Sequence, residues 1–313
     1  LYTPPRTPKS ERGGHLPACE TLLDWARQLQ AINLETLQDL PAKIAANKLF
    51  NNDYLLHFLI QHYSQHYETM LIILTRQALA ETKTDYLSSS PLQSTKITNN
   101  RIALPAGHYR MGGQEPIAYD NELPPQQADL DPFEINRTPV SNAEFLGFME
   151  DDGYHRSDLW DEQSLLWQKQ NKYHYPDHWQ QDKHDNWYAI GVRGPYELAA
   201  DEPVMGLSYH EACAFANWAG ARLPHEYQWE TASRLQELQL TGRVWEWCQN
   251  TFHPYQGFKA FPYDEYSQAW FDGEHFSLRG GSLYTRPAIK RPSFRNFYQA
   301  DKRFIFAGLR LAW

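Results

Sequence analysis

Two histidines spaced four residues apart, His62 and His66, are the side chains of this chain best suited to metal chemistry. Residues four apart project from the same side of a helix, and at about 100° per residue the two imidazoles lie about 40° apart. Such a pair can share one metal ion, and both zinc and non-heme iron accept imidazole nitrogen. A stable site needs three or four ligands, and two ordinary core or surface histidines would show the same spacing.

The segment around the pair has the pattern of a long helix. Residues 51–53 (Asn-Asn-Asp) form an N-cap cluster, and the helix is predicted to run from there to about Ala80. Its apolar stripe is predicted to be Leu55, Leu59, Tyr63, Met70, Ile73 and Leu74. Both imidazoles are expected at the edge of this buried stripe. His57 falls on the opposite face and is a poor third ligand, and His15 stands in a loop of unknown position.

The rest of the chain divides into a helical first part and a loop-rich second part. Residues 21–30 are predicted to be helical, and the polar segment 86–100 to be a linker. After it, short strands are predicted at 102–104, 108–111 and 133–135. Two further helices are predicted from capping boxes, in which a serine is followed three residues later by a glutamate: Ser141 with Glu144, and Ser208 with Glu211. Gly220 is expected just after the second of these helices.

Composition excludes several classes of function. The net charge of −9 argues against nucleic acid as a main partner, because phosphate binding needs a basic face. No apolar run of about 18 residues is present, so no membrane partner is expected, and no signal peptide begins the chain. Three widely spaced cysteines (Cys19, Cys213 and Cys248) are no disulfide framework and favour a reducing cytoplasm.

Residues 102–313 resemble the formylglycine-generating-enzyme (sulfatase-modifying-factor) fold, a variant of the C-type-lectin scaffold with little regular structure. The matching segments are 105–112, 139–145, 221–230, 242–247, 278–282 and 307–311. Their order and spacing are specific to that fold. Within it, three tryptophans are expected to pack in the core, namely Trp229, Trp245 and Trp247. Three arginines are expected to tie loops together through carboxylate or backbone contacts, namely Arg279, Arg295 and Arg310.

The upstream piece His62-x-x-Gln65-His66-x-Glu68 resembles the end of a DinB-like helical bundle. The fusion of that bundle to the lectin-like fold is typical of the sulfoxide synthases of ergothioneine and ovothiol biosynthesis, and further segments resemble the ergothioneine (hercynine oxygenase) branch. Those segments are 118–122, 150–154, 254–258, 262–267 and 291–297. The resemblance implies an α+β chain. Its expected parts are a partial DinB-like domain at 1–85 that lacks its first helix, a linker at 86–101, and the lectin-like domain at 102–313.

The resemblance also implies a chemistry and its residues. The family binds Fe(II) through three histidines and uses dioxygen to join hercynine, at C2 of the imidazole, to cysteine or γ-glutamylcysteine, with oxidation of the sulfur. His62 and His66 match two of the iron ligands, and Gln65 matches a residue that contacts hercynine. The residues expected around the trimethylammonium group of hercynine are Tyr266, Asn296 and Phe297. Tyr263 matches the tyrosine that supplies a proton or hydrogen atom.

Three departures from the family pattern bear on this reading. The first histidine ligand of the family lies farther upstream of the pair than the 61 residues that precede His62, so the third ligand is expected upstream of Leu1. Some members place an aspartate where Tyr298 stands, with Lys302 and Arg303 nearby, so the donor substrate stays open. Formylglycine-generating enzymes need a cysteine pair after the Arg-Gly-Gly-Ser segment, and residues 283–295 contain none, which disfavours their reaction.

Three alternatives remain beside the sulfoxide synthase. A selenoneine synthase would use hercynine and a selenosugar in the same fold. An ovothiol enzyme is disfavoured, because it acts on unmethylated histidine and usually carries a further methyltransferase domain. A non-catalytic lectin-like binding protein is the rival from another class, since fold does not determine function. Arg6 and Arg12 lie where some members bind a carboxylate. The oligomeric state and any structural calcium stay open.

Overall fold

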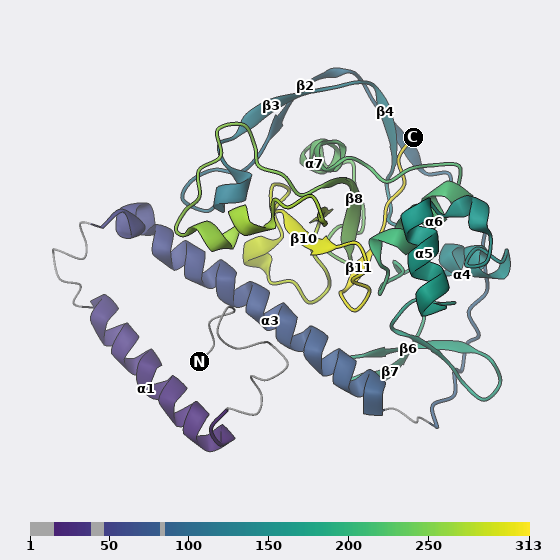
Figure 1. The fold of residues 1–313 in the computed structure, drawn as a ribbon, viewed down its shortest axis with the longest axis horizontal. Helices are drawn as coiled ribbons and strands as arrows, with labels where there is room; N and C mark the ends of the chain where they lie inside the picture. The colour runs from purple at the N-terminus through teal and green to yellow at the C-terminus, as the bar shows by residue number, and fades with distance from the viewer. Residues whose placement is uncertain (1–15, 39–46, 82–84) are drawn as a thin grey trace. The chain divides into compact units, whose positions relative to one another are not determined.

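The computed structural model describes residues 16–38, 47–81 and 85–313, which form two compact units, residues 1–52 and 53–313 (Figure 1). The first unit contains α1 (Cys19–Gln38), a helix that extends beyond the predicted 21–30 and has no buried residue. Arg6, Arg12 and His15 lie outside the described residues.

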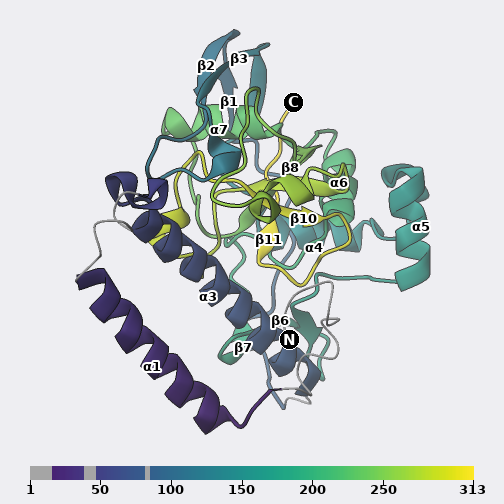
Figure 2. The same ribbon diagram turned by 60° about the vertical axis from the view of Figure 1, so that its left-hand side comes forward.

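The second unit begins with α3 (Tyr54–Glu81), the helix that carries the histidine pair. It follows the short 3-10 segment η2 (Lys48–Asp53), in which Asn52 and Asp53 have positive φ angles, so the predicted helix start is confirmed. α3 packs against β6 (Trp187–Gly191) and the 3-10 turn η7 (Pro287–Ile289), in the same compact unit as the strands (Figure 2). The predicted domain boundaries around 86–101 stay a prediction.

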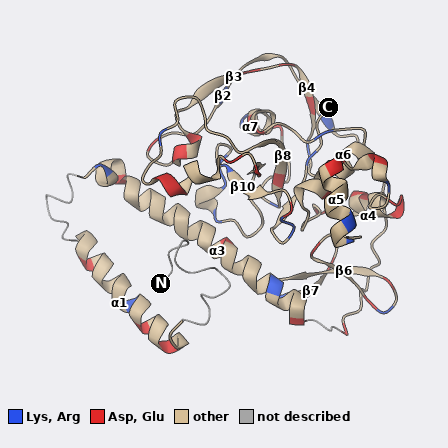
Figure 3. Cartoon of the chain, in the orientation of Figure 1, with Lys and Arg blue, Asp and Glu red and all other residues tan. Residues whose placement is uncertain are grey.

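The buried face of α3 differs from the predicted stripe. The residues that it buries are Tyr54, Phe58, Gln61, Ser64, Glu68, Ile72 and Thr75. The predicted stripe is wrong for Tyr63, Met70, Ile73 and Leu74, whose side chains are 47–67% exposed. The cause is that α3 contacts residues 85–313 through aromatic rings and hydrogen bonds rather than through an aliphatic stripe. Gln61 Nε2, for example, donates to the carbonyl oxygen of Ile117 over 2.8 Å. Figure 3 shows that α3 carries few charged residues. Its buried face therefore consists mainly of apolar and uncharged polar residues, which a hydropathy pattern does not separate from its exposed face.

Residues 85–313 form an α+β arrangement in which the described strands make four small sheets. The central sheet has the order β10-β9-β8-β11, with β11 parallel to β8 and the other pairs antiparallel. Its strands are β8 (Trp245–Thr251), β9 (His275–Arg279), β10 (Asn296–Gln299) and β11 (Ala307–Gly308). The remaining strands are β1 (Arg101–Leu104), β2 (Gly107–Met111), β3 (Gln126–Leu130), β4 (Phe133–Asn136), β5 (Trp179–Gln181), β6 and β7 (Gly194–Glu197). The strands predicted at 102–104, 108–111 and 133–135 are thus confirmed.

Four shorter helices complete this unit, namely α4 (Asn142–Glu150), α5 (Glu162–Asn171), α6 (Tyr209–Trp218) and α7 (Glu226–Arg234). Both predicted capping boxes are present: the serine hydroxyl accepts from the glutamate backbone N–H, and the glutamate carboxylate accepts from the serine backbone N–H. Gly220 follows α6 with φ +61°. The capped helix starts were therefore readable from the residues, and the α+β character implied by the resemblance is confirmed.

The core of residues 85–313 contains the three tryptophans and three arginines expected there. Trp229, Trp245 and Trp247 are at most 3% exposed. The three arginines are buried as well, and each guanidinium binds a glutamate and backbone carbonyl oxygens: Arg279 and Arg295 bind Glu226, and Arg310 binds Glu246. A loop-rich fold is thereby held by buried, hydrogen-bonded charges that connect segments far apart in sequence.

The predicted linker is irregular in structure, but hydrogen bonds fix it to the residues that follow it. Glu197 accepts from the backbone N–H of Ser89 over 2.6 Å and from the hydroxyls of Ser88 and Ser89. Farther along, the backbone N–H of Thr98 donates to Glu144. The backbone N–H of Ser89, with the serine hydroxyls, lowers the pKa of Glu197 to about 2.

Acid is expected to release this segment. A carboxylate whose pKa is lowered in the folded protein contributes stability that is present above its unfolded pKa of 4.5 and is lost as pH falls toward 2. Between these pH values, the hydrogen-exchange protection factors of residues 86–90 should fall in the wild type. In Glu197→Gln, these protection factors should already be low at pH 6 and change little on acidification. Equal profiles for the two proteins would contradict this assignment.

None of the described helices is long and apolar enough to cross a membrane.

Candidate functional site

The histidine pair lies in the middle of α3 with its ring nitrogens converging. Nε2 of His62 and Nε2 of His66 are 2.9 Å apart. His62 is half-buried and stacks on Phe58, with ring centroids 5.5 Å apart, whereas His66 is exposed. Burial, and next the neighbouring His66, lower the pKa of His62, so its ring is neutral at pH 7 and keeps a lone pair.

This geometry fits a shared metal ion. Two nitrogen ligands about 2.1 Å from one ion and at right angles to each other are about 3.0 Å apart, close to the separation of the two Nε2 atoms. The same separation also allows one ring to donate its N–H to the other. The Nδ1 atom of His62 is buried and has no hydrogen-bond partner among the described residues. In residues 16–38, 47–81 and 85–313, no group of three metal-ligating side chains occurs, so a metal held by this pair would need further ligands.

Gln65, between the two histidines, is connected to the loop that carries the two predicted tyrosines. The hydroxyl of Tyr266 donates to Gln65 Oε1 over 3.1 Å. The Tyr266 ring lies 6.4 Å from His62 and 6.1 Å from the exposed Tyr263. The structure therefore brings together four predicted site residues: His62, Gln65, Tyr263 and Tyr266.

Local structure explains how these tyrosines reach α3. They lie at the 3-10 turn η5 (Asp264–Tyr266), which Ser267 fixes by donating to the carboxylate of Asp120 over 2.5 Å. Tyr119, a residue that the sequence reasoning missed, stacks on Tyr266 with centroids 4.4 Å apart. Burial, and next Tyr119, raise the pKa of Tyr266 well above 10, so the phenol stays protonated and acts as the donor to Gln65.

Asn296, Phe297 and Tyr298 lie on β10, in the central sheet. Phe297 stacks on Phe252 with centroids 4.3 Å apart, and Asn296 Oδ1 accepts from the backbone N–H of Phe297. Tyr298 is half-buried. Burial, and next the charge of Glu68, raise the pKa of Tyr298 to about 12. Phe297 belongs to an aromatic cluster with Trp270 and His275.

Lys302 and Arg303 form ion pairs with residues outside the histidine–tyrosine group. Lys302 pairs with Asp301 at the surface. The Arg303 guanidinium is 8% exposed, binds Glu211 over 2.8 Å and lies over the ring of Tyr173. Arg303 lines a cavity of about 370 Å³ with Arg76 and Asp177, near the last turns of α3. The structure thus separates Arg303 from the His62–Gln65–Tyr266 group.

Glu68 is a second residue whose role the sequence reasoning missed, although it belongs to the quoted motif. Its carboxylate is buried and accepts from Trp245 on β8 and from Ser282 and Thr285 in one turn, the 282–285 turn. The spacing of Glu68 after His66 was visible in the sequence, but its partners come from about 180–220 positions downstream, which no local pattern could indicate.

With this geometry in view, comparison with known proteins assigns the chain in two steps. The family described as "Sulfatase-modifying factor enzyme 1-like domain" matches residues 88–239 and 235–313, so residues 88–313 carry that domain. The chain belongs to the hercynine oxygenase family.

Three relatives support this assignment. The hercynine oxygenase of Mycobacterium tuberculosis is 33% identical over 305 residues, which cover 81% of this chain and 70% of the relative. The hercynine oxygenase of Mycolicibacterium smegmatis is 32% identical with the same coverage. The formylglycine-generating enzyme of Thermomonospora curvata is 34% identical, but over only 44% of this chain and 50% of that protein.

Proposed function

We propose that this protein is an Fe(II)- and O2-dependent sulfoxide synthase of ergothioneine biosynthesis, which joins the imidazole C2 of hercynine to a thiol, cysteine or γ-glutamylcysteine. The observation that carries the proposal is the convergence of the His62 and His66 Nε2 atoms next to Gln65 and Tyr266, in a member of the hercynine oxygenase family. His62 and His66 would hold the iron, with further ligation from outside the described residues. Bound iron would supply the activation of dioxygen.

The described residues would bind and orient the substrates. Because Tyr266 donates to Gln65 Oε1, the Gln65 amide is turned so that its NH2 group is left as a donor for a substrate nitrogen or carboxylate. The aromatic faces of Tyr266 and Phe297 suit a trimethylammonium group, because aromatic rings attract quaternary cations.

Tyr263 is the candidate proton donor. Its side chain is 42% exposed and lies at the same turn as Tyr266. Burial, and next the charge of Asp120, raise the pKa of Tyr263, so the phenol carries its proton at neutral pH. A phenol that is protonated and partly open to solvent can deliver a proton to a substrate and recover it from water.

The test is product analysis with full-length protein reconstituted with Fe(II). Hercynine and air are supplied with cysteine, γ-glutamylcysteine or a selenosugar in separate reactions, and the products are identified by mass spectrometry. A sulfoxide conjugate from one thiol would support the proposal and name the donor. A selenium conjugate alone would reassign the protein as a selenoneine synthase. If no donor gave a product while iron was bound, the interpretation as a non-catalytic binding protein would be favoured.

Replacing Tyr266 with phenylalanine is expected to weaken hercynine binding more than turnover. The change removes the hydroxyl that orients Gln65 and keeps the aromatic ring, and one hydrogen bond is worth about 0.5–1.5 kcal/mol. We therefore expect the KM for hercynine to rise about 2–10-fold with kcat nearly unchanged. Tyr263→Phe should show the opposite pattern, a loss in kcat. Equal changes in both parameters for both variants would contradict these roles.

A further inference from the structure

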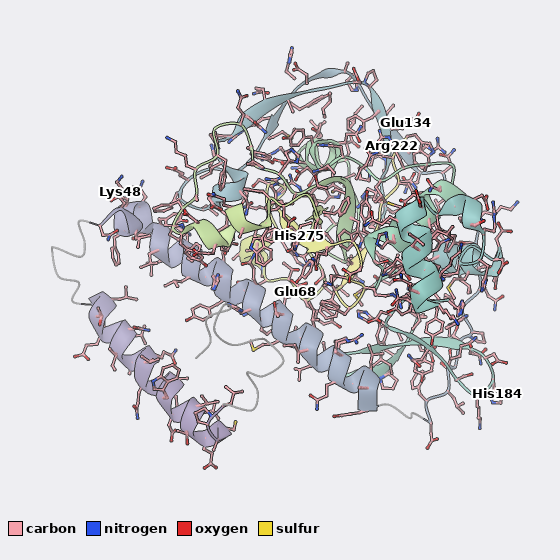
Figure 4. All side chains as sticks on the ribbon, viewed as in Figure 1. Lys48, Glu68, Glu134, His184, Arg222 and His275 are labelled. Carbon is pink, nitrogen blue, oxygen red and sulfur yellow. The ribbon has the colours of Figure 1, made fainter. Side chains whose placement is uncertain are left out.

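Glu68 connects the metal-binding helix to the lectin-like fold through hydrogen bonds from neutral donors. Figure 4 labels Glu68 on α3, on the side of the helix that faces the strands. Its Oε1 accepts from the indole N–H of Trp245 over 2.8 Å and from the hydroxyl of Ser282 over 2.5 Å. Its Oε2 accepts from the hydroxyl of Thr285 over 2.6 Å. One side chain of α3 is thus bound to both β8 and the 282–285 turn.

The group that receives Glu68 is itself fixed. The backbone N–H of Ser282 donates to Thr285 Oγ1 over 2.7 Å, and the backbone N–H of Tyr284 donates to Ser282 Oγ. Ser282 and Thr285 are at most 4% exposed. A buried carboxylate needs such donors, because desolvating a charge without hydrogen bonds is costly. The turn therefore offers a preformed position for the Glu68 carboxylate.

The place of Glu68 in the sequence makes this contact relevant to the histidine pair. Gln61 directly precedes His62 and donates to the Ile117 carbonyl oxygen, and Glu68 follows His66 by two residues. The pair is thus held between two polar contacts with the lectin-like fold. A slip of α3 by one residue would turn His62 and His66 by about 100° away from the turn that carries Tyr266.

We propose that Glu68 is a positioning residue, which fixes the rotation and height of α3 so that His62, Gln65 and His66 face the turn at Tyr263 and Tyr266. The inference rests on the proposed function and deepens it, because it assigns the residue that aligns the two halves of the site. It concerns geometry rather than charge: the carboxylate acts through the shape of its hydrogen bonds to Trp245, Ser282 and Thr285.

Two variants separate geometry from charge. Glu68→Gln keeps the length of the side chain, and its amide oxygen can accept the two bonds made by Oε1. The amide NH2 would then face Thr285 Oγ1, which can rotate its hydroxyl and accept. Glu68→Ala removes all three bonds. Arg76→Ala is the matched control, because the half-exposed Arg76–Asp177 pair also joins α3 to the lectin-like fold but lies more than two turns beyond His66.

The experiment measures metal binding, spectrum and exchange as well as activity. Loss of a partner that orients a metal ligand typically costs about 10–100-fold in metal affinity or activity. We expect that loss for Glu68→Ala in Fe(II) affinity, with an altered electronic spectrum of the Co(II)-substituted protein. Glu68→Gln should recover both to within about 3-fold, and Arg76→Ala should match the wild type. In metal-free protein, hydrogen exchange across residues 58–66 should rise in Glu68→Ala alone.

The outcomes separate this inference from the proposed function. Wild-type exchange and metal affinity in Glu68→Ala would overturn the positioning role. Damage in Glu68→Gln equal to that in Glu68→Ala would also overturn it, in favour of a role for the charge. If the wild type formed no product with any donor, the proposed function would fail, whereas the exchange measurement on metal-free protein would still decide the role of Glu68.

Discussion

His62→Ala is expected to abolish metal binding and turnover while leaving the protein folded. Removing a residue that only orients a metal ligand lowers metal affinity or activity about 10–100-fold. Removing the ligand itself should therefore lower the Fe(II) affinity by more than about 100-fold. The fold should tolerate the change, because His62 is half-buried and its Nδ1 has no partner to lose. Metal analysis after reconstitution, combined with product formation from hercynine and the active donor, measures both effects.

The same helix supplies the control. His57 lies one turn before Gln61 on α3 and makes no contact with the other site residues through its ring, so His57→Ala should retain about one metal ion per chain and full activity. His66→Ala should match His62→Ala, because the two Nε2 atoms converge on one point. If both His62→Ala and His66→Ala retained bound iron, the iron site would not be the histidine pair.

The local parts of this architecture were predictable because local chemistry determines them. The start of α3 follows from the Asn-Asn-Asp cluster, and the starts of α4 and α6 follow from Ser141 and Ser208 with their glutamates. The association of His62, Gln65, Tyr263 and Tyr266 was predictable only through family resemblance. These residues are about 200 positions apart, and no periodicity relates Gln65 to Tyr266.

The orientation of α3 was not predictable from hydropathy, for a physical reason. The helix buries Gln61, Ser64, Glu68 and Thr75 and exposes Met70 and Ile73. Gln61 and Glu68 can be buried at low cost because a carbonyl oxygen, an indole and two hydroxyls of distant segments bind them. The hydroxyls of Ser64 and Thr75 donate to carbonyl oxygens one turn earlier on α3 itself. The roles of Glu68 and Tyr119 escaped sequence reasoning for the same reason.

Glu226→Gln is expected to destabilise the domain at residues 88–313 more than any other single change considered for this protein. The Glu226 carboxylate is fully buried and binds the guanidinium groups of Arg279 and Arg295 over 2.7–2.8 Å. Burial alone would raise the pKa of Glu226, but Arg295 and Arg279 outweigh it and hold that pKa well below its usual range. Removing the charge leaves the buried Arg295 without a carboxylate partner and leaves Arg279 with Glu230 alone, at 3.1 Å. Breaking a buried pair costs about 3–5 kcal/mol. Denaturant unfolding monitored by tryptophan fluorescence measures the loss.

The loss of stability should also disturb the candidate site residues on β10. Arg295 donates to the Asn121 and His253 carbonyl oxygens and directly precedes Asn296 on that strand. Glu134→Gln is the control: it breaks the exposed Arg101–Glu134 pair and should change the free energy of unfolding by at most about 1 kcal/mol. If both variants lost the same small free energy of unfolding, the remaining contacts of the two arginines, namely Glu230 and Tyr255 for Arg279 and backbone carbonyl oxygens for both, would be sufficient. A large loss confined to Glu226→Gln would instead show that the loops carrying β10 depend on this one carboxylate.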